Sequence, residues 1–246
     1  MEFKLPTETI ELPSKGLLYP EGHPLSGGTI EMKYMTAKEE DILTNQNYIK
    51  NGTVIDKLLQ SLIITEFDYN DILIGDKNAI MVAARILSYG KDYEFEYNGE
   101  KQTADLSTLI SKEIDPSLYK RGQNEFEFTL PHTSNVVTFK LLTHGDERKI
   151  EQEIKGLQRI NKDNIFEVST RLKYLITSIN GSSDKKDIRA FVEQGLLARD
   201  ARSLREEYAR ISPDIQLKFI FEDANGEEQE ASLPIGVTFF WPDVKL

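Results

Sequence analysis

Two stretches of this chain share one design, an aromatic strand followed by an Asn-Gly turn and a polar return strand. The first reads DYEFEYNGEKQTADL and turns at Asn98 and Gly99. The second reads LKFIFEDANGEEQEASL and turns at Asn225 and Gly226. Asn-Gly is the strongest short-range signal for a β-hairpin, because both residues tolerate the positive φ that a two-residue turn requires. An isolated hairpin is only marginally stable, so each one should pack on its preceding helix or project as a contact finger.

The elements before each hairpin repeat in the same order. TIEMKYMTAKEEDIL matches VVTFKLLTHGDERKI as a strand, a Thr and an acidic helix start, and VIDKLLQSLII matches STRLKYLITSI as a second helix. A third helix, which starts DKNAIMVAARI or DARSLREEYARI, leads into each hairpin. This shared order indicates an internal duplication; the alternative is a generic order with chance matches. The sequence therefore predicts an α+β fold of two tandem similar units, each strand–helices–β-hairpin, over residues 29–115 and 123–235.

Three residues are predicted to cap helices. Thr36 begins T-A-K-E, a capping box in which the Glu39 side chain reaches back to the Thr36 amide. Asp76 and Asp200 hold corresponding places at the start of the third helix of each series. Asp is a favoured N-cap residue because its side chain accepts hydrogen bonds from free amides of the first turn. We therefore expect both aspartates to be N-caps.

Both ends of the chain are apolar and interrupted by proline. Residues 1–28 contain four prolines and four glycines, which predicts an extended segment that its own domain or a partner must hold. Residues 236–246 form an aromatic tail with the only Trp, which either docks on the core or inserts into another subunit. Aromatic side chains dominate interface hot spots, so the candidate interface residues are Leu12, Pro13, Leu17, Tyr19, Phe239, Phe240, Trp241 and Pro242.

Composition narrows the classes of partner. The formal net charge of −11 argues against nucleic acid, because a phosphate backbone attracts basic surfaces. The sequence contains no run of about 20 apolar residues such as a membrane span requires, and MEFKLPTETIELPSKG has no apolar core of a secretory signal. The chain contains no cysteine, which excludes disulfides and thiolate chemistry and is compatible with a reducing cytoplasm.

Motifs of catalysis are absent. The sequence has no phosphate-binding glycine loop, no H-E-x-x-H and no G-x-S-x-G. The three histidines, His23, His132 and His144, are far apart in sequence and are interpreted as surface-loop residues. Acidic pairs fall in first turns of predicted helices, where the helix dipole favours carboxylates without a catalytic role. We therefore predict no catalytic, cofactor-binding or metal-binding residue, and the chain is not expected to be an enzyme.

Several stretches resemble one protein family. ELPSKGLLYP, DILIGDKNAIMVAARILSYGKDYEF, FTLPHTSNVVTFKLLTHGDE and the closing FFWPD resemble the baseplate hub subunits, also described as tail or hub assembly chaperones, of T-even-type contractile-tailed phages. The resemblance covers almost the whole chain, and LPSKGLLYP and GDKNAIMVAARILSYGKDYEF are its most specific parts. Some relatives carry Cys-pair zinc knuckles where this chain has its hairpins. Because Asn-Gly turns stand at those places here, no zinc role is carried over.

The resemblance implies a non-enzymatic role in building a phage tail. The partners would be other tail proteins, either a hub protein or the tape-measure protein, and the protein would reside in the virion baseplate or in the host cytoplasm during assembly. Two roles remain open, a permanent subunit of the baseplate hub and a transient assembly chaperone. A remote alternative from another class is a cell-wall hydrolase, which would need two carboxyl groups facing each other across a cleft.

Overall fold

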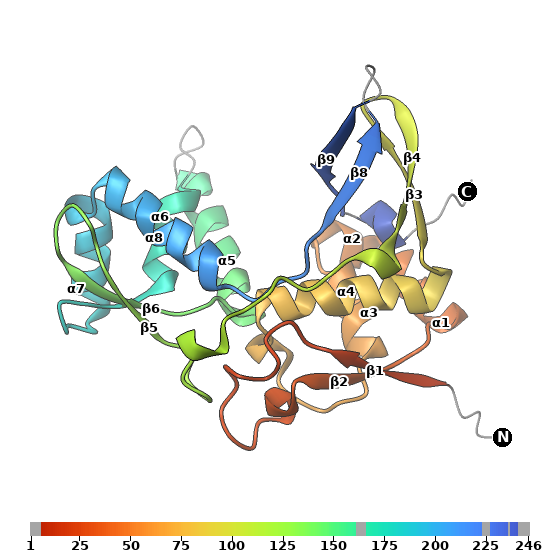
Figure 1. Ribbon diagram of the computed structural model, residues 1–246, viewed down its shortest axis with the longest axis horizontal. Coiled ribbons are helices and arrows are strands. Elements are labelled where there is room, and N and C mark those ends of the chain that lie inside the picture. The colour runs from red at the N-terminus through yellow and green to blue at the C-terminus, as the bar shows by residue number, and fades with distance from the viewer. Residues whose placement is uncertain (1–5, 161–165, 223–226, 236, 241–246) are drawn as a thin grey trace.

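The chain forms two lobes that lie next to each other (Figure 1). The computed structural model describes all residues except 1–5, 161–165, 223–226, 236 and 241–246. Helix accounts for 46% and strand for 22%, which confirms the predicted α+β class. Among the described residues, no helix is both long enough and apolar enough to cross a membrane.

The first lobe combines a two-stranded sheet, helices and a hairpin. Its elements are β1 (Thr7–Glu11), β2 (Thr29–Lys33), α1 (Ala37–Leu43), α2 (Gln46–Lys50), α3 (Val54–Leu62), α4 (Ile74–Tyr89), β3 (Asp92–Tyr97) and β4 (Glu100–Asp105). Helix α3 is amphipathic and buries Leu58, Leu59 and Leu62 completely. This buried face packs against α1 and α4, so the hydrophobic spacing read from the sequence sets the packing of the lobe.

The N-terminal segment is part of this lobe. Strand β1 pairs antiparallel with β2, and Ile10 lies opposite Ile30. The loop between the two strands buries Leu12, Leu18 and Tyr19. Of the two means by which this segment could be held, its own domain or a partner, the structure therefore shows its own domain.

The second lobe is built on a three-stranded antiparallel sheet in the order β5-β6-β7. Its elements are β5 (Phe126–Thr129), β6 (Val136–Phe139), α5 (His144–Ile160), α6 (Glu167–Leu175), β7 (Ile176–Ile179), α7 (Lys185–Ala190), a π-helical turn (Phe191–Gly195) and α8 (Ala198–Ile211). The prediction that STRLKYLITSI forms one helix was wrong for its last four residues, which form β7. Ile176 and Ile179 pair with Phe139 and Val137 of β6, and β-branched residues suit such a buried strand.

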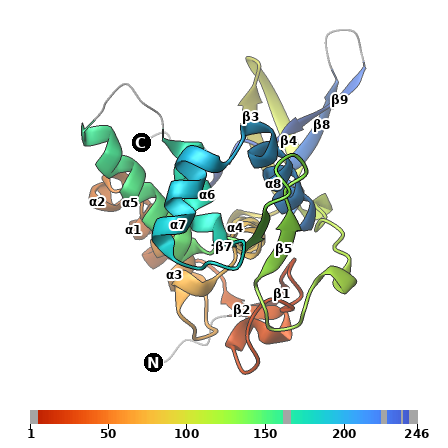
Figure 2. The ribbon, with the colours of Figure 1, turned by 90° about the vertical axis from the view of Figure 1, so that its left-hand side faces the viewer.

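The second hairpin, β8 (Lys218–Glu222) with β9 (Glu228–Ser232), returns to the first lobe. Figure 2 shows it beside the hairpin β3–β4, on the same side of the molecule. The ring of Phe219 packs edge-to-face on Phe95 at 4.7 Å between centroids, and Tyr97 lies 5.0 Å from Phe221. The hairpin at the end of the predicted second unit, residues 123–235, therefore packs on the first lobe. It packs on the other hairpin because both carry aromatic rings on one face.

The aromatic tail also docks on the first lobe. Phe239 and Phe240 lie in a 3₁₀ turn (Val237–Phe240) and have no exposed surface. The ring of Phe239 contacts Tyr93 of β3 at 4.9 Å between centroids, and the turn packs against α4. Of the two sequence alternatives, docking on the core is the one observed for these two residues. The predicted contacts of Trp241 and Pro242 lie outside the described residues.

The two lobes approach each other at backbone distance. The amide of Ile74 donates to the Leu142 carbonyl at 3.2 Å, and the amide of His144 donates to the Ile72 carbonyl at 2.8 Å. A Cβ atom on Gly75 would lie 1.8 Å from the carbonyl oxygen of Pro213, so only glycine permits this contact between α4 and the segment that follows α8. The lobe arrangement therefore depends on a residue without a side chain.

We expect Phe240→Ala to destabilise the isolated protein by about 3–5 kcal/mol, because it removes a fully buried ring and leaves a cavity. Chemical denaturation measures the change. The control is Ile160→Ala, whose side chain is 86% exposed and which should shift the free energy of unfolding by less than about 0.5 kcal/mol. An unchanged midpoint for Phe240→Ala would contradict internal docking of the tail.

Candidate functional site

Asp76 anchors the N-terminal segment to the first lobe. It is the third residue of α4 and has no exposed surface. Its carboxylate accepts hydrogen bonds from the Ser14 amide at 2.9 Å, the Ser14 hydroxyl at 2.7 Å and the Tyr19 hydroxyl at 2.7 Å. Burial raises the pKa of Asp76, and the bonds from Ser14 and Tyr19 oppose that rise.

The predicted N-cap role of Asp76 was wrong. Leu73 is the N-cap residue of α4, and its amide donates to the Tyr19 hydroxyl at 3.0 Å. The Asp76 carboxylate instead binds a loop 62 residues away in sequence. The propensity of Asp for helix starts located the residue correctly. Its partner could not be read from local sequence, because the partner belongs to another element.

Asp200 performs the same task in the second lobe. It is the third residue of α8, after the N-cap Leu197, and it is also fully buried. Its carboxylate accepts the amides of His132 at 2.9 Å and Thr133 at 3.1 Å, and the Thr133 hydroxyl at 2.8 Å. Burial alone would raise the pKa of Asp200, but the bonds from His132 and Thr133 outweigh it and lower the pKa. The prediction of an N-cap was wrong here for the same reason.

Thr36 is the N-cap of α1, as predicted. Its amide donates to Glu39 Oε2 at 3.0 Å, and Lys33 Nζ lies 2.8 Å from Glu39 Oε1. Burial would raise the pKa of Glu39, but the hydrogen bonds from Lys33 and Thr36 hold it at about 2. The Glu39 carboxylate is thus charged at neutral pH, and its oxygens are bound by Lys33 and Thr36.

A polar cluster lies where the two lobes meet. Lys77 of α4 donates to Asp56 Oδ1 of α3 at 2.6 Å and lies 3.2 Å from Nδ1 of His144, at the start of α5. His144 Nε2 lies 3.6 Å from Asp56 Oδ2, and the Tyr69 ring packs edge-on at 4.7 Å between centroids. Because Nδ1 faces an ammonium group, the imidazole accepts there and carries its proton on Nε2.

The environment keeps His144 neutral. Burial lowers the pKa of this imidazole, and the charge of Lys77 lowers it further, against the opposing charge of Asp56. The prediction that His144 is a surface-loop residue was wrong, since only 4% of it is exposed. The flanking Gly145 suggested a loop; in the structure it permits close approach to Asn70 of the first lobe. Of the other two histidines, His132 is exposed, whereas His23 is half-buried against Tyr19.

The charged groups of these clusters contact one another or groups of the fold. In the part of the chain that the structure describes, no three His, Cys, Asp or Glu side chains gather as a metal site would require. Asp76, Asp200 and Glu39 have their oxygens occupied by donors of the fold. The Asp56–Lys77–His144 group links the lobes. Its chemistry is that of an inter-lobe polar contact.

The residues proposed for an interface at the N-terminus line the core instead. Leu12, Pro13 and Tyr19 are buried, and Leu17 is half-buried. The sequence left open whether this segment is held by its own domain or by a partner, and these residues were the candidate interface with a partner. This loop has little regular structure, yet its apolar residues belong to the core, and hydrogen bonds to the buried Asp76 fix its position.

The first predicted hairpin turn is confirmed. Asn98 and Gly99 have φ of 53° and 83°, the positive values that a two-residue turn needs. The second turn, Asn225-Gly226, lies outside the described residues. Strands β3 and β4 pair in full register from Asp92 opposite Asp105 to Tyr97 opposite Glu100.

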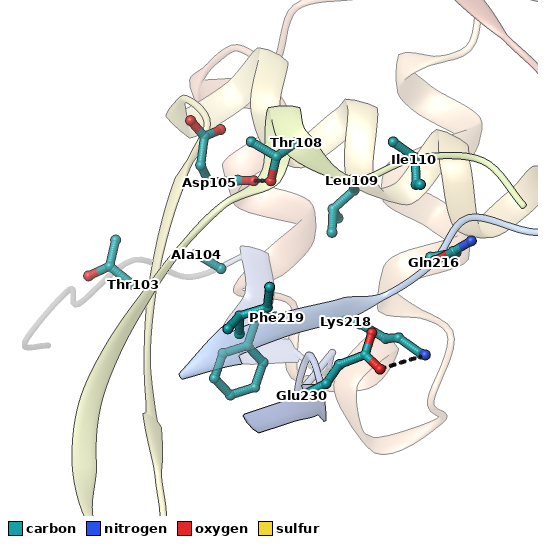
Figure 3. A pocket seen from close by; sticks show the side chains of 11 residues that line it. Thr103, Ala104, Asp105, Thr108, Leu109, Ile110, Gln216, Lys218, Phe219 and Glu230 are labelled. Atoms are coloured by element: carbon teal, nitrogen blue, oxygen red, sulfur yellow. Dashed lines mark hydrogen bonds and ion pairs between the residues drawn. The ribbon is translucent and has the colours of Figure 1, made fainter. Parts of the chain in front are cut away.

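A groove of about 330 Å³ lies between the two hairpins. Figure 3 shows strand β4 and the turn after it on one side, and strand β8 on the other. Two isoleucines that line it are unusually exposed, Ile110 at 62% and Ile220 at 69%. The sequence pattern did not predict this site, although a projecting hairpin that makes contacts was one of the two alternatives. The alternation in KFIFE, which leaves Ile220 on the face opposite the two Phe residues, was the available signal.

Comparisons of the chain with protein-family models, with curated proteins and with solved structures find no match.

We expect Asp76→Ala to lower the free energy of unfolding by about 3 kcal/mol or more, because it leaves buried donors on Ser14 and Tyr19 unpaired. Chemical denaturation is the measurement. The control is Asp68→Ala, at an exposed aspartate that accepts the Asn70 amide at 2.9 Å, which should cost about 1 kcal/mol or less. Equal, small losses for both variants would show that Asp76 acts only as a helix-end charge.

The inter-lobe cluster should make stability depend on pH. Because the pKa of His144 is lowered on folding, the unfolded chain binds this proton more tightly, and stability is lost as pH falls below about 6.5, the ordinary histidine pKa. We expect the unfolding free energy to fall more between pH 7.5 and 5 in the unmodified protein than in His144→Gln. Parallel pH profiles for the two proteins would refute this.

Proposed function

We propose that this protein is an assembly protein that acts through protein–protein contacts and carries out no chemical reaction. The observation that carries the proposal is the groove between the two adjoining hairpins, where Ile110 and Ile220 are exposed. Large apolar side chains exposed together at a groove are typical of interaction sites. The buried carboxylates have their oxygens bound by donors of the fold, which supports the same class of non-enzymatic protein.

Within that class, we propose a baseplate hub subunit of a contractile-tailed phage of T-even type. The support is the resemblance of LPSKGLLYP and GDKNAIMVAARILSYG to that family, and the two stretches bind each other through Ser14, Tyr19 and Asp76. A hub or tape-measure protein is the proposed partner, and the virion baseplate, or the host cytoplasm during assembly, is the proposed location.

The tandem-unit hypothesis is also kept as a proposal, and repeated polar contacts support it. Each lobe has a lysine at the end of a strand, a threonine three residues later and an acidic residue three residues after that. The lysine and the threonine both bind the acidic side chain. The three residues are Lys33, Thr36 and Glu39 in the first lobe and Lys140, Thr143 and Asp146 in the second. A second similarity supports the tandem units. The residue after the second helix pairs with a strand in both lobes: Ile63 forms a bridge with Met32, and Ile176 pairs with Phe139.

The buried carboxylates support the same duplication. Asp76 and Asp200 each stand third in a long helix, and each binds the loop that follows Leu-Pro after the first strand of its lobe. The arginines near the ends of these two helices do not share a role: Arg85 donates to the carbonyls of Gly90 and Asp92, whereas Arg210 pairs with Glu207. In this proposal, exchange of hairpin packing between the lobes followed the duplication.

Mass spectrometry of purified phage particles beside infected-cell lysate tests the proposal. We expect peptides of this protein in the particles at a constant ratio to the known baseplate proteins. A capsid protein serves as the control for particle recovery. Presence in lysate with absence from particles would support the transient assembly chaperone instead. Clearing of peptidoglycan overlays by the purified protein would overturn the non-enzymatic class.

A further inference from the structure

The two hairpins present open backbone edges to the groove. In the register of β4, the Leu106 amide donates to the Lys91 carbonyl at 2.8 Å, so opposed residues exchange hydrogen bonds at every second position from there. The peptide groups of Thr103 and Asp105 therefore point away from β3. Both residues line the groove.

The same reasoning applies to β8. The Leu233 amide donates to the Leu217 carbonyl at 3.0 Å, which places Phe219 and Phe221 in the hydrogen-bonded pairs with β9. The peptide group of Ile220 therefore points away from β9, and Ile220 lines the groove as well. Each wall of the groove thus includes the unpaired edge of a two-stranded sheet.

One end of the groove is closed by the chain itself. The Gln216 amide donates to the Ile110 carbonyl at 2.9 Å, and Ser111 forms an antiparallel bridge with Ile215. Beyond this short pairing the two segments separate into β4 and β8, as Figure 3 shows. Backbone pairing between the two segments therefore stops at the groove and does not continue between β4 and β8.

Charge limits what can occupy the gap. The described residues of the two hairpins, 92–105, 218–222 and 227–232, contain nine acidic residues and two lysines. Lys218 is paired with Glu230 at 2.9 Å, so its charge is already offset. A basic occupant would be attracted and an acidic one repelled.

We propose that this groove binds one extended segment of a partner protein as an added β-strand, in which apolar residues alternate with lysine or arginine. The backbone of the segment pairs with the edges of β4 and β8. Because side chains alternate along a strand, its apolar side chains point to the face that carries Phe219, and its basic side chains lie on the face of Ile220, beside Glu222 and Glu230. Strand addition at an exposed sheet edge is a common mode of peptide recognition. The inference rests on the proposed function in its choice of a protein partner.

A model peptide tests the site on the full chain. The probe is a fluorescent eight-residue peptide of alternating valine and lysine, and fluorescence polarisation measures its binding. A valine–glutamate peptide and a valine–lysine peptide with N-methylated amides on one edge are the controls. We expect binding of the first peptide only, weakened by salt, with slowed hydrogen exchange at the amides of Thr103 and Ile220.

Two variants separate the groove edge from the opposite edge of the same hairpin. Ile220→Pro removes a donor that faces the groove, and Glu228→Pro removes a donor on the far edge of β9, since Glu228 lies opposite Glu222 in a pair without hydrogen bonds. Proline is tolerated at such outward positions. We expect about tenfold weaker peptide binding for Ile220→Pro, the loss of one or two ladder bonds, and little change for Glu228→Pro.

The outcomes distinguish the inference from the proposed function. Equal binding of all three peptides, or unchanged hydrogen exchange at Thr103 and Ile220, would overturn the strand-addition site whether or not a proline variant folds. Protein found in phage particles in that case would leave the proposed function intact. Binding of the valine–lysine peptide by a protein absent from both particles and tail assembly intermediates would retain the groove and refute the phage role.

Discussion

The burial of a carboxylate at the third position of a long helix is the constraint on which each lobe depends. Asp76 cannot lose its three donors without leaving a buried polar group unpaired, so Ser14 and Tyr19 are held in place. With Tyr19 held, the loop between β1 and β2 packs Leu12 and Leu18 on the core without regular elements of its own. Asp200 organises the second lobe by the same means.

Features that depend on neighbouring residues could be predicted from the sequence. The capping box at Thr36 and the turn at Asn98-Gly99 are each specified by a few adjacent residues. The stretch VIDKLLQSLII was likewise predicted as a helix, and it forms α3. Strand β7 was missed because its four residues continue a helical pattern, and only pairing with β6 decides their conformation.

The sequence did not predict which surface each apolar residue packs against. Sequence pattern marks Tyr19 and Phe239 as residues that must be buried, but burial within the chain and burial against a partner leave the same pattern. The exposure of Ile220 could not be recognised in the sequence, because it stands between two aromatic residues of one strand. His144 shows the same limit, because a histidine beside glycine looks like a loop residue until the other lobe is in place.

Because the second hairpin packs on the first lobe, the first lobe cannot be completed until the end of the chain has been synthesised. The Tyr93 hydroxyl donates to the Pro234 carbonyl at 2.9 Å across a separation of 141 residues. A ribosome must therefore synthesise the second lobe before the aromatic face of β3 can be covered. Contacts of such sequence separation form slowly, and uncovered aromatic strands are prone to association meanwhile. The acidic residues on both hairpins would keep nascent chains apart by mutual repulsion during this interval.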